Sequence, residues 1–165
     1  MKFTVEKKDI SEALSLVASV AEKRQSIPVL SNILLKAEKA GLTLIATDLE
    51  IELTFKISKI ELINEGETTV SARKLADLIR SVPEDTLLTF ELIENQLEIR
   101  ALKFQADFST LPVGDFPVTE IQEFQREVAL PGKELSDLIE KTSFAMASQD
   151  VRYYLNGILL EVSPS

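Results

Sequence analysis

The chain repeats one pattern of residues three times, and this repeat limits the folds that it can adopt. Residues 3–14 align with residues 128–139 at an offset of 125, and the same offset relates residues 31–36 to residues 156–161. A third copy, at an offset of 65 from the first, lies at residues 70–79. Because repeated units bury their apolar faces against one another, we expect one supersecondary unit for each copy.

The composition suits a soluble protein and makes catalysis less expected without excluding it. Hydrophobic residues make up 45% of the 165 residues, which suits a buried core. With neither cysteine nor histidine, the chain lacks disulfides, thiolates, the usual general base and the commonest zinc ligand. No apolar run is long enough to span a membrane, and no signal peptide is visible. We therefore expect a cytoplasmic protein with no cofactor and no membrane partner.

Periodicity predicts an α+β fold in which helices alternate with groups of antiparallel strands. Ile10, Ala13, Leu14 and Val17 form one apolar stripe, so we predict a helix from Asp9 to about Val20. A shorter helix is predicted over 73–81 and a third over about 133–144. The predicted strands are 3–5, 30–37, 42–46, 47–55, 68–70, 86–92, 96–101, 103–110, 127–130 and 153–162.

The third copy of the repeat has fewer strands than the first two. Two prolines and a glycine in residues 111–117 predict a linker before this copy begins. A unit with too few strands leaves an unpaired sheet edge. We therefore expect the N-terminal part of a longer repeat protein, in which the segment after residue 125 is less stable than the first 115 residues.

Basic residues favour the predicted helices, although the net charge is −9. Residues 70–80 hold three bases and one acid, whereas residues 81–120 hold two bases and eight acids. Lys8, Arg73 and Lys133 occupy the same place in the three copies, at a helix start, where the helix dipole disfavours a base. This repeated position indicates either a phosphate contact or a solvated base.

Two further groups of polar residues allow alternative interpretations. Asp48, Glu50 and Glu52 would share one face of a strand, as in a Mg²⁺ site of a nuclease or as an ordinary solvated face. Arg24 and Gln149 are related by the offset of 125 and lie on loops, which suits contacts to phosphates and base edges or an ordinary polar loop.

The two tyrosines of the chain, Tyr153 and Tyr154, are adjacent. At a strand start, this arrangement predicts one buried ring and one exposed ring. Stacking on a nucleic-acid base is the alternative.

Five segments together resemble the bacterial replicative sliding clamp family, the β subunit of DNA polymerase III. They are Thr47–Glu50, Val70–Lys74, Ser109–Pro112, Asp115–Pro117 and, most specifically, Phe144–Gly157. The resemblance extends from Met1 to the end of the chain. It implies a DNA-clamp fold, with residues 1–118 as domain I, residues 119–126 as a linker and residues 127–165 as the start of domain II.

The resemblance also implies a function. Members of the family form a homodimeric ring around double-stranded DNA, with helices lining the hole and sheets outside. The ring does no chemistry and tethers the catalytic subunit of DNA polymerase III, after a clamp loader has placed it on DNA. A metal-dependent nuclease and a repeat adaptor with no nucleic-acid role remain as the alternatives from the residues alone.

The resemblance implies three groups of site residues. The DNA contacts are Arg24, Arg73, Lys74, Gln149, Arg152, Tyr153 and Tyr154. Leu155 matches a residue of the cleft that binds partner peptides. In the ring interface, Lys103 and Phe108 belong to the strand that faces domain III of the other subunit.

Overall fold

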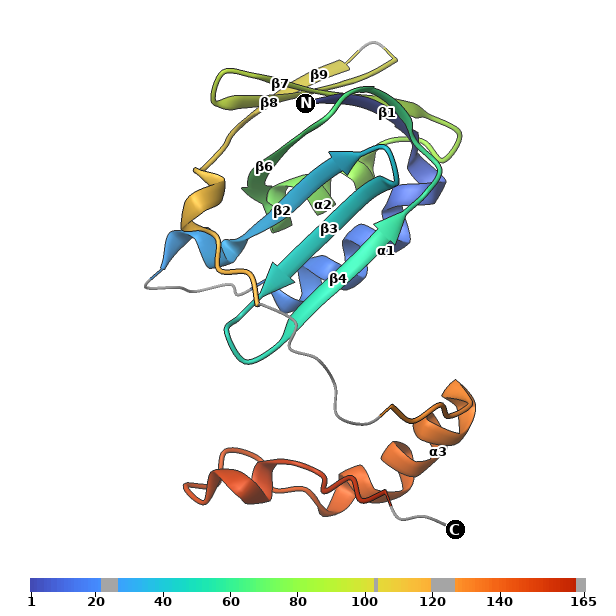
Figure 1. Ribbon diagram of the computed structural model, residues 1–165, viewed down its shortest axis with the longest axis vertical. Coiled ribbons are helices and arrows are strands. Elements are labelled where there is room, and N and C mark those ends of the chain that lie inside the picture. Colours follow the sequence, from blue (N-terminus) through green and yellow to red (C-terminus); the bar gives the residue numbers. More distant parts are fainter. Residues whose placement is uncertain (22–26, 103, 120–126, 163–165) are drawn as a thin grey trace. The chain divides into compact units, whose positions relative to one another are not determined.

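The computed structural model describes residues 1–21, 27–102, 104–119 and 127–162. The chain forms two compact units, Met1–Glu120 and Ile121–Ser165 (Figure 1). Within the described ranges, every helix is too short or too polar to cross a lipid bilayer.

The first unit contains two antiparallel sheets and two α-helices, which confirms the predicted α+β class. The five-stranded sheet has the order β5 (Glu61–Asn64), β1 (Lys2–Glu6), β7 (Leu87–Ile93), β8 (Gln96–Ala101) and β9 (Phe104–Ser109). The four-stranded sheet has the order β4 (Glu52–Ile57), β3 (Gly41–Thr47), β2 (Asn32–Glu38) and β6 (Gly66–Ser71). The helices are α1 (Lys7–Val20) and α2 (Ala72–Ser81). The short strand β5 was not predicted from the sequence.

The two copies of the repeat exchange their first strands. Each copy runs as a strand, a helix and three strands: β1-α1-β2-β3-β4 and then β6-α2-β7-β8-β9. Strand β1 pairs with β7, so that Phe3 lies opposite Phe90, and β6 pairs with β2, so that Val70 lies opposite Ile33. The rings of Phe3 and Phe90 stack with centroids 4.8 Å apart. Each sheet of the unit is therefore completed by a strand from the other copy.

Both helices bury their apolar stripes in one core with the inner faces of the two sheets. The stripe predicted for α1 is buried in full, and α2 buries Leu75 and Ile79. Figure 1 shows α1 and α2 together on one side of the four-stranded sheet. Each fully buried leucine or isoleucine side chain contributes about 2 kcal/mol to the stability of this arrangement.

A buried lysine connects the start of α1 to the loop that follows α2. Lys7 is only 4% exposed. Its Nζ donates hydrogen bonds to the carbonyl oxygen of Val82 at 2.6 Å and to Oε1 of Glu84 at 2.7 Å. The backbone N–H of Lys7 donates to the carbonyl oxygen of Thr86 at 2.9 Å. One residue of the first copy thus holds the helix–strand loop of the second copy.

Residues 111–117, which were predicted to be a linker, instead pack on the first unit, so that prediction is wrong. Leu111 bridges to Thr69 of β6, and residues Val113–Asp115 form a 3₁₀-helix. Phe116 is buried in a second apolar cluster with Val29, Leu34 and Ile45. The prolines and the glycine end the regular strand here, but an aromatic side chain holds the segment against the four-stranded sheet.

In the second unit, the helices of the repeat form and the strands do not. The helical stretch made of α3 (Gly132–Thr142) and a 3₁₀-helix (Ser143–Ala145) corresponds to α1 at the offset of 125. At the same offset, the 3₁₀-helix Tyr153–Asn156 corresponds to the 3₁₀-helix Pro28–Ser31.

The strands predicted over 127–130 and 153–162 are therefore wrong. The described residues of this unit offer them no partner strand for hydrogen bonds, and no residue of 127–162 is buried.

We predict that Lys7→Met destabilises the first unit by about 2 kcal/mol, because it leaves the carbonyl oxygen of Val82 without its buried donor. Lys8→Met is the matched control, since the Lys8 side chain is 62% exposed, and it should change stability by less than about 0.5 kcal/mol. Urea denaturation followed by circular dichroism measures both variants. Equal effects of the two substitutions would contradict a structural role for Lys7.

Candidate nucleic-acid interface

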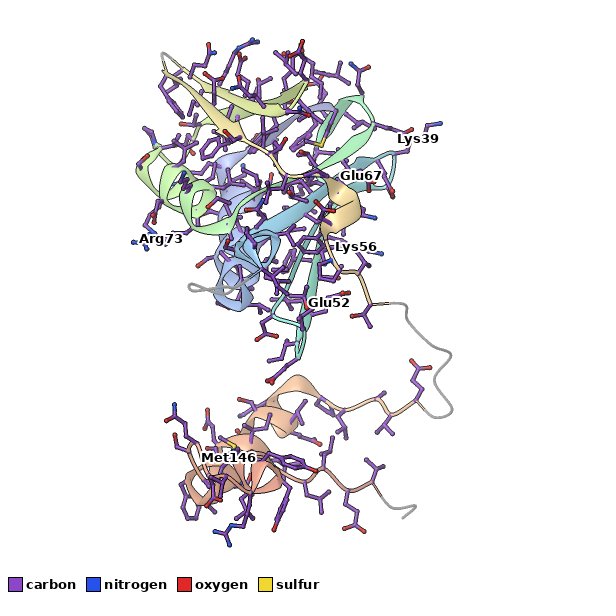
Figure 2. All side chains as sticks on the ribbon, turned by 90° about the vertical axis from the view of Figure 1, so that its left-hand side faces the viewer. Lys39, Glu52, Lys56, Glu67, Arg73 and Met146 are labelled. Carbon is purple, nitrogen blue, oxygen red and sulfur yellow. The ribbon has the colours of Figure 1, made fainter. Side chains whose placement is uncertain are left out.

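The outer face of α2 carries three bases and one acid. Arg73, Lys74 and Arg80 are all exposed, and the side chain of Arg73 is 86% accessible to solvent. Asp77 lies between the two arginines, 3.8 Å from Nε of Arg73 and 3.0 Å from Nη1 of Arg80. We call Arg73, Lys74 and Arg80 the cationic face of α2. Figure 2 shows Arg73 projecting from the unit on the side away from Lys39 and Lys56.

The first turn of α2 increases the positive potential of this face. It contains no acidic residue, and Ser71 at the N-cap makes no side-chain hydrogen bond to the helix. A helix N-terminus carries partial positive charge and open backbone N–H groups, which attract anions. Arg73 and Lys74 therefore add their charges at the end of the helix that already favours a phosphate.

A groove of about 550 Å³ lies beside the cationic face, between α2 and the end of α1. Small side chains and the three bases line most of it: Ala18, Ala21, Ser31, Ser71, Ala72 and Ala76, with Arg73, Lys74 and Arg80. The small residues leave a groove between the helices, and the long basic side chains border it.

The three bases of the repeat occupy equivalent positions, as predicted. Lys8, Arg73 and Lys133 are each the second residue of their helix. Their surroundings differ, because Lys8 forms an ion pair with Glu6, whereas the contact of Arg73 among the described residues is the long one with Asp77, at 3.8 Å. The pair between Lys8 and Glu6 raises the pKa of the lysine and lowers that of the glutamate. Arg73 is therefore better placed than Lys8 to bind a phosphate.

In the second unit, the predicted DNA contacts lie on one loop, residues 147–157, which we call the 147–157 loop. Its ends are joined by a hydrogen bond of 2.9 Å from the N–H of Ala147 to the carbonyl oxygen of Leu155. Gln149 is exposed and has a left-handed backbone, with φ of 58°. Arg152 forms an ion pair with Asp150, at 3.0 Å between Nη2 and Oδ2.

Both tyrosines of the 147–157 loop are exposed, so the prediction of one buried ring and one exposed ring is wrong. Tyr153 is 83% exposed and Tyr154 is 67% exposed. They belong to a 3₁₀-helix rather than to a strand, and their rings meet edge to face at 5.9 Å. Two exposed rings are available for stacking on a base. Leu155 follows them on the same 3₁₀-helix and is also exposed.

Of the three remaining predicted site residues, the structure describes only Phe108. Arg24 and Lys103 lie outside the described residues. Phe108 lies on β9, the edge strand of the five-stranded sheet, where its half-buried ring packs against the main core.

The acidic run Asp48, Glu50 and Glu52 does not share one strand face, because the strand predicted over 47–55 is found only from Glu52 onward, as β4. Strand β3 ends at Thr47 and β4 begins at Glu52. Between them, Oδ1 of Asp48 accepts hydrogen bonds from the N–H groups of Glu50 at 3.0 Å and Ile51 at 2.7 Å. These bonds lower the pKa of Asp48. Asp48 therefore stabilises a turn, and the described part of the chain contains no cluster of acids suited to a metal ion.

Two features, one in each unit, were not predicted from the sequence. Arg80 is seven residues from Arg73 and so lies on the same helix face, a spacing that could have indicated its place. The pair between Asp150 and Arg152 lies outside any regular element, where spacing does not predict which side chains meet.

Comparison with protein families places this geometry in a known context. Residues 1–122 match the model described as DNA polymerase III beta subunit, N-terminal domain. Residues 129–165 match the model for the central domain of the same subunit.

Individual relatives agree with the family models. The chain is 47% identical over 163 residues to the beta sliding clamp of Pseudomonas putida KT2440, and 38% identical over 161 residues to that of Escherichia coli K12. These matches cover 99% and 98% of the chain but 44% of each relative. The chain thus spans less than half the length of the relatives that it matches.

Solved structures show the same likeness. The chain resembles a sliding clamp from Pseudomonas aeruginosa bound to griselimycin, with a TM-score of 0.93 and 45% identity. It also resembles the polymerase III beta subunit of Caulobacter crescentus, with a TM-score of 0.90 and 37% identity. The two matches cover 98% and 95% of this chain, and 44% and 42% of those chains.

We predict that the carboxyl group of Asp150 titrates below the ordinary aspartate pKa, because the side chain and the backbone N–H of Arg152 donate to it. A depressed pKa means that the contact is complete above the unfolded pKa and is lost as the pH falls through the folded value. Arg152→Ala should return the pKa toward its ordinary value, whereas Lys141→Ala, which removes a base from α3, should not. Carbon-13 NMR titration of the carboxyl groups measures this, and an unchanged Asp150 pKa in Arg152→Ala would contradict it.

Proposed function

The chain belongs to the DNA polymerase III beta subunit family, and we propose that it forms part of a sliding clamp that encircles duplex DNA. In this proposal, residues 1–118 are domain I, residues 119–126 are a linker and residues 127–165 begin domain II. The clamp does no chemistry. It tethers the catalytic subunit of the replicative polymerase, so that the polymerase stays on its template.

The observation that carries the proposal is the exposure of the cationic face of α2. A clamp must hold DNA without stopping, so its contacts must be weak and independent of sequence. Phosphate contacts from exposed bases meet both requirements, because they carry no sequence information and are screened by salt. Arg73, Lys74 and Arg80 are such bases, and Arg73 and Lys74 lie at a helix N-terminus that favours anions.

The distribution of acidic residues also supports a DNA contact at α2 rather than at the five-stranded sheet. The exposed acids Glu84, Asp85, Glu94 and Asp107 belong to the strands and loops of the five-stranded sheet rather than to α2. These carboxylates repel a polyanion, so DNA that approaches this unit meets least resistance at the helices. A net charge of −9 is thus compatible with a DNA-facing surface where bases outnumber acids locally, as they do on the outer face of α2.

The 147–157 loop supplies the second proposed DNA contact. Gln149, Tyr153 and Tyr154 are exposed on it and offer an amide and two aromatic rings. Glutamine and tyrosine side chains can donate hydrogen bonds to phosphate oxygens of a duplex without regard to sequence. Arg24 is proposed to act with Gln149 by its position in the repeat, although it lies outside the described residues.

The ring and its partners extend the proposal beyond this chain. Strand β9 is an edge strand, so its open side suits the ring interface of a homodimer, with Phe108 as an apolar anchor. Lys103, which lies outside the described residues, is proposed to belong to the same interface. Leu155 is proposed to line part of the cleft that receives peptides of the polymerase catalytic subunit and the clamp loader.

We predict that the isolated chain binds duplex DNA weakly, with a dissociation constant of about 10⁻⁴ M or higher at physiological salt. Replacing Arg73 and Lys74 together by alanine should reduce the log–log salt slope of binding by about 1.8, since each lost phosphate contact removes about 0.9. Fluorescence anisotropy with a labelled duplex over a range of salt concentrations measures the slope.

The matched control for this experiment is Lys39→Ala with Lys56→Ala, two exposed bases on the side of the unit away from Arg73 (Figure 2). It removes the same charge and should leave the slope nearly unchanged. Equal slopes for both double variants would show that DNA responds only to net charge. A repeat adaptor without a nucleic-acid role would bind no DNA in any of these forms.

We predict that Phe108→Ala, in a version extended to the full length of its relatives, raises the dissociation constant of the dimer by about tenfold, as expected for an aromatic interface anchor. Ile63→Ala is the matched control, because Ile63 lies on β5, the opposite edge of the same sheet. Analytical ultracentrifugation gives the dimer constant, and circular dichroism verifies that both variants are folded. A tighter or unchanged dimer in Phe108→Ala would rule out this edge as the interface.

A further inference from the structure

We propose that Asp150 and Arg152 form a latch that sets the shape of the 147–157 loop, so that Arg152 positions the DNA contact of Gln149 and does not itself bind phosphate. This inference rests on the proposed function, because it assigns roles within the DNA-contacting loop. It changes the role of Arg152, which the family resemblance had grouped with the direct DNA contacts.

The first argument is that the guanidinium of Arg152 already binds an anion, the carboxylate of Asp150. Its Nε donates to Oδ1 of Asp150 at 3.1 Å and its Nη2 donates to Oδ2 at 3.0 Å. This two-point geometry is the strong form of an arginine–carboxylate contact. A DNA phosphate would have to displace the carboxylate or approach against its charge. The pair as a whole carries no net charge, so it adds little to electrostatic attraction.

The second argument is that Asp150 is held from its backbone as well. Its N–H donates to Oδ1 of Asn156 at 2.9 Å, and its carbonyl oxygen accepts a hydrogen bond from Nδ2 of Asn156 at 3.0 Å. The N–H of Arg152 donates to Oδ1 of Asp150 at 2.8 Å. Every polar group of Asp150 is therefore engaged within the loop, which is expected of a structural residue.

The third argument concerns Gln149, the residue immediately before Asp150. Its φ of 58° is in the left-handed region, which is costly for a residue with a side chain. Such a conformation persists only where the surroundings enforce it. Asn156 holds the backbone of Asp150 and Arg152 holds its carboxylate, so the conformation of Gln149 depends on a network of which the latch is part.

A purely electrostatic role of the loop and a structural role of the latch predict opposite effects of one substitution, Asp150→Asn. This substitution therefore distinguishes the two roles. Asp150→Asn removes a negative charge, so a purely electrostatic loop would bind DNA more tightly. If the latch sets the shape, the same variant should bind about fivefold more weakly, which corresponds to the loss of about one hydrogen bond. Arg152→Lys retains the charge but cannot form the two-point contact, so it should lose as much affinity as Arg152→Ala.

The experiment measures duplex binding by the 165-residue chain over a range of salt concentrations, with Glu134→Gln as the control that removes a negative charge from α3. We expect Asp150→Asn to weaken binding with an unchanged salt slope, and Glu134→Gln to leave binding equal or tighter. Tighter binding by Asp150→Asn, full binding by Arg152→Lys, or a salt slope reduced by about 0.9 in Arg152→Ala would overturn the latch.

A second measurement does not need DNA. The backbone carbon-13 shifts of Gln149 report its left-handed conformation and should change in both Asp150→Asn and Arg152→Lys, but not in Glu134→Gln. Unchanged shifts would overturn the latch even if no binding were detected. Absence of salt-dependent DNA binding by the unsubstituted chain, with the shift changes present, would instead count against the proposed function and leave the latch standing.

Discussion

The exchange of first strands between the two copies of the repeat is the constraint on which the first unit depends. Strand β1 hydrogen-bonds to β7 and β6 to β2, so neither copy completes a sheet alone. Lys7 strengthens this dependence, since it joins the first helix to the loop after the second. The exchange also aligns the copies so that α1 and α2 lie side by side and present one surface. The groove beside the cationic face of α2 is therefore a product of the pairing, because both copies line it.

The same constraint explains which elements could be predicted from the sequence. Helices satisfy their hydrogen bonds locally, and the helix of the third copy forms over the same span as α1 at the offset of 125. Strands need a neighbour, so the pattern at residues 127–130 predicted a strand that the structure does not contain. The prediction of a linker at residues 111–117 was wrong for a related reason, because Phe116 is buried against residues that lie far away in the sequence.

The candidate site shows a similar division. The repeat placed Arg73 at a helix start and related Gln149 to Arg24, and family resemblance added Lys74. Alternation at residues 48–52 is compatible with a strand face, whereas Asp48 uses its carboxylate to form a turn. The pairing of Asp150 with Arg152 depends on side-chain geometry in an irregular loop. No periodicity encodes such a contact, so only the folded structure could reveal it.

Bases in this chain differ in function according to their burial and partners. Lys7 is buried and bound to a carbonyl group, and Arg152 is held by a carboxylate at two points. Both stabilise local structure. Arg73 has a long, exposed contact, which contributes little to stability and leaves its charge free to act on a ligand. A surface that must hold a polyanion and still slide along it requires bases of this weakly held kind. Tightly held bases serve a different purpose, because they fix the loops and helices from which the weak contacts are made.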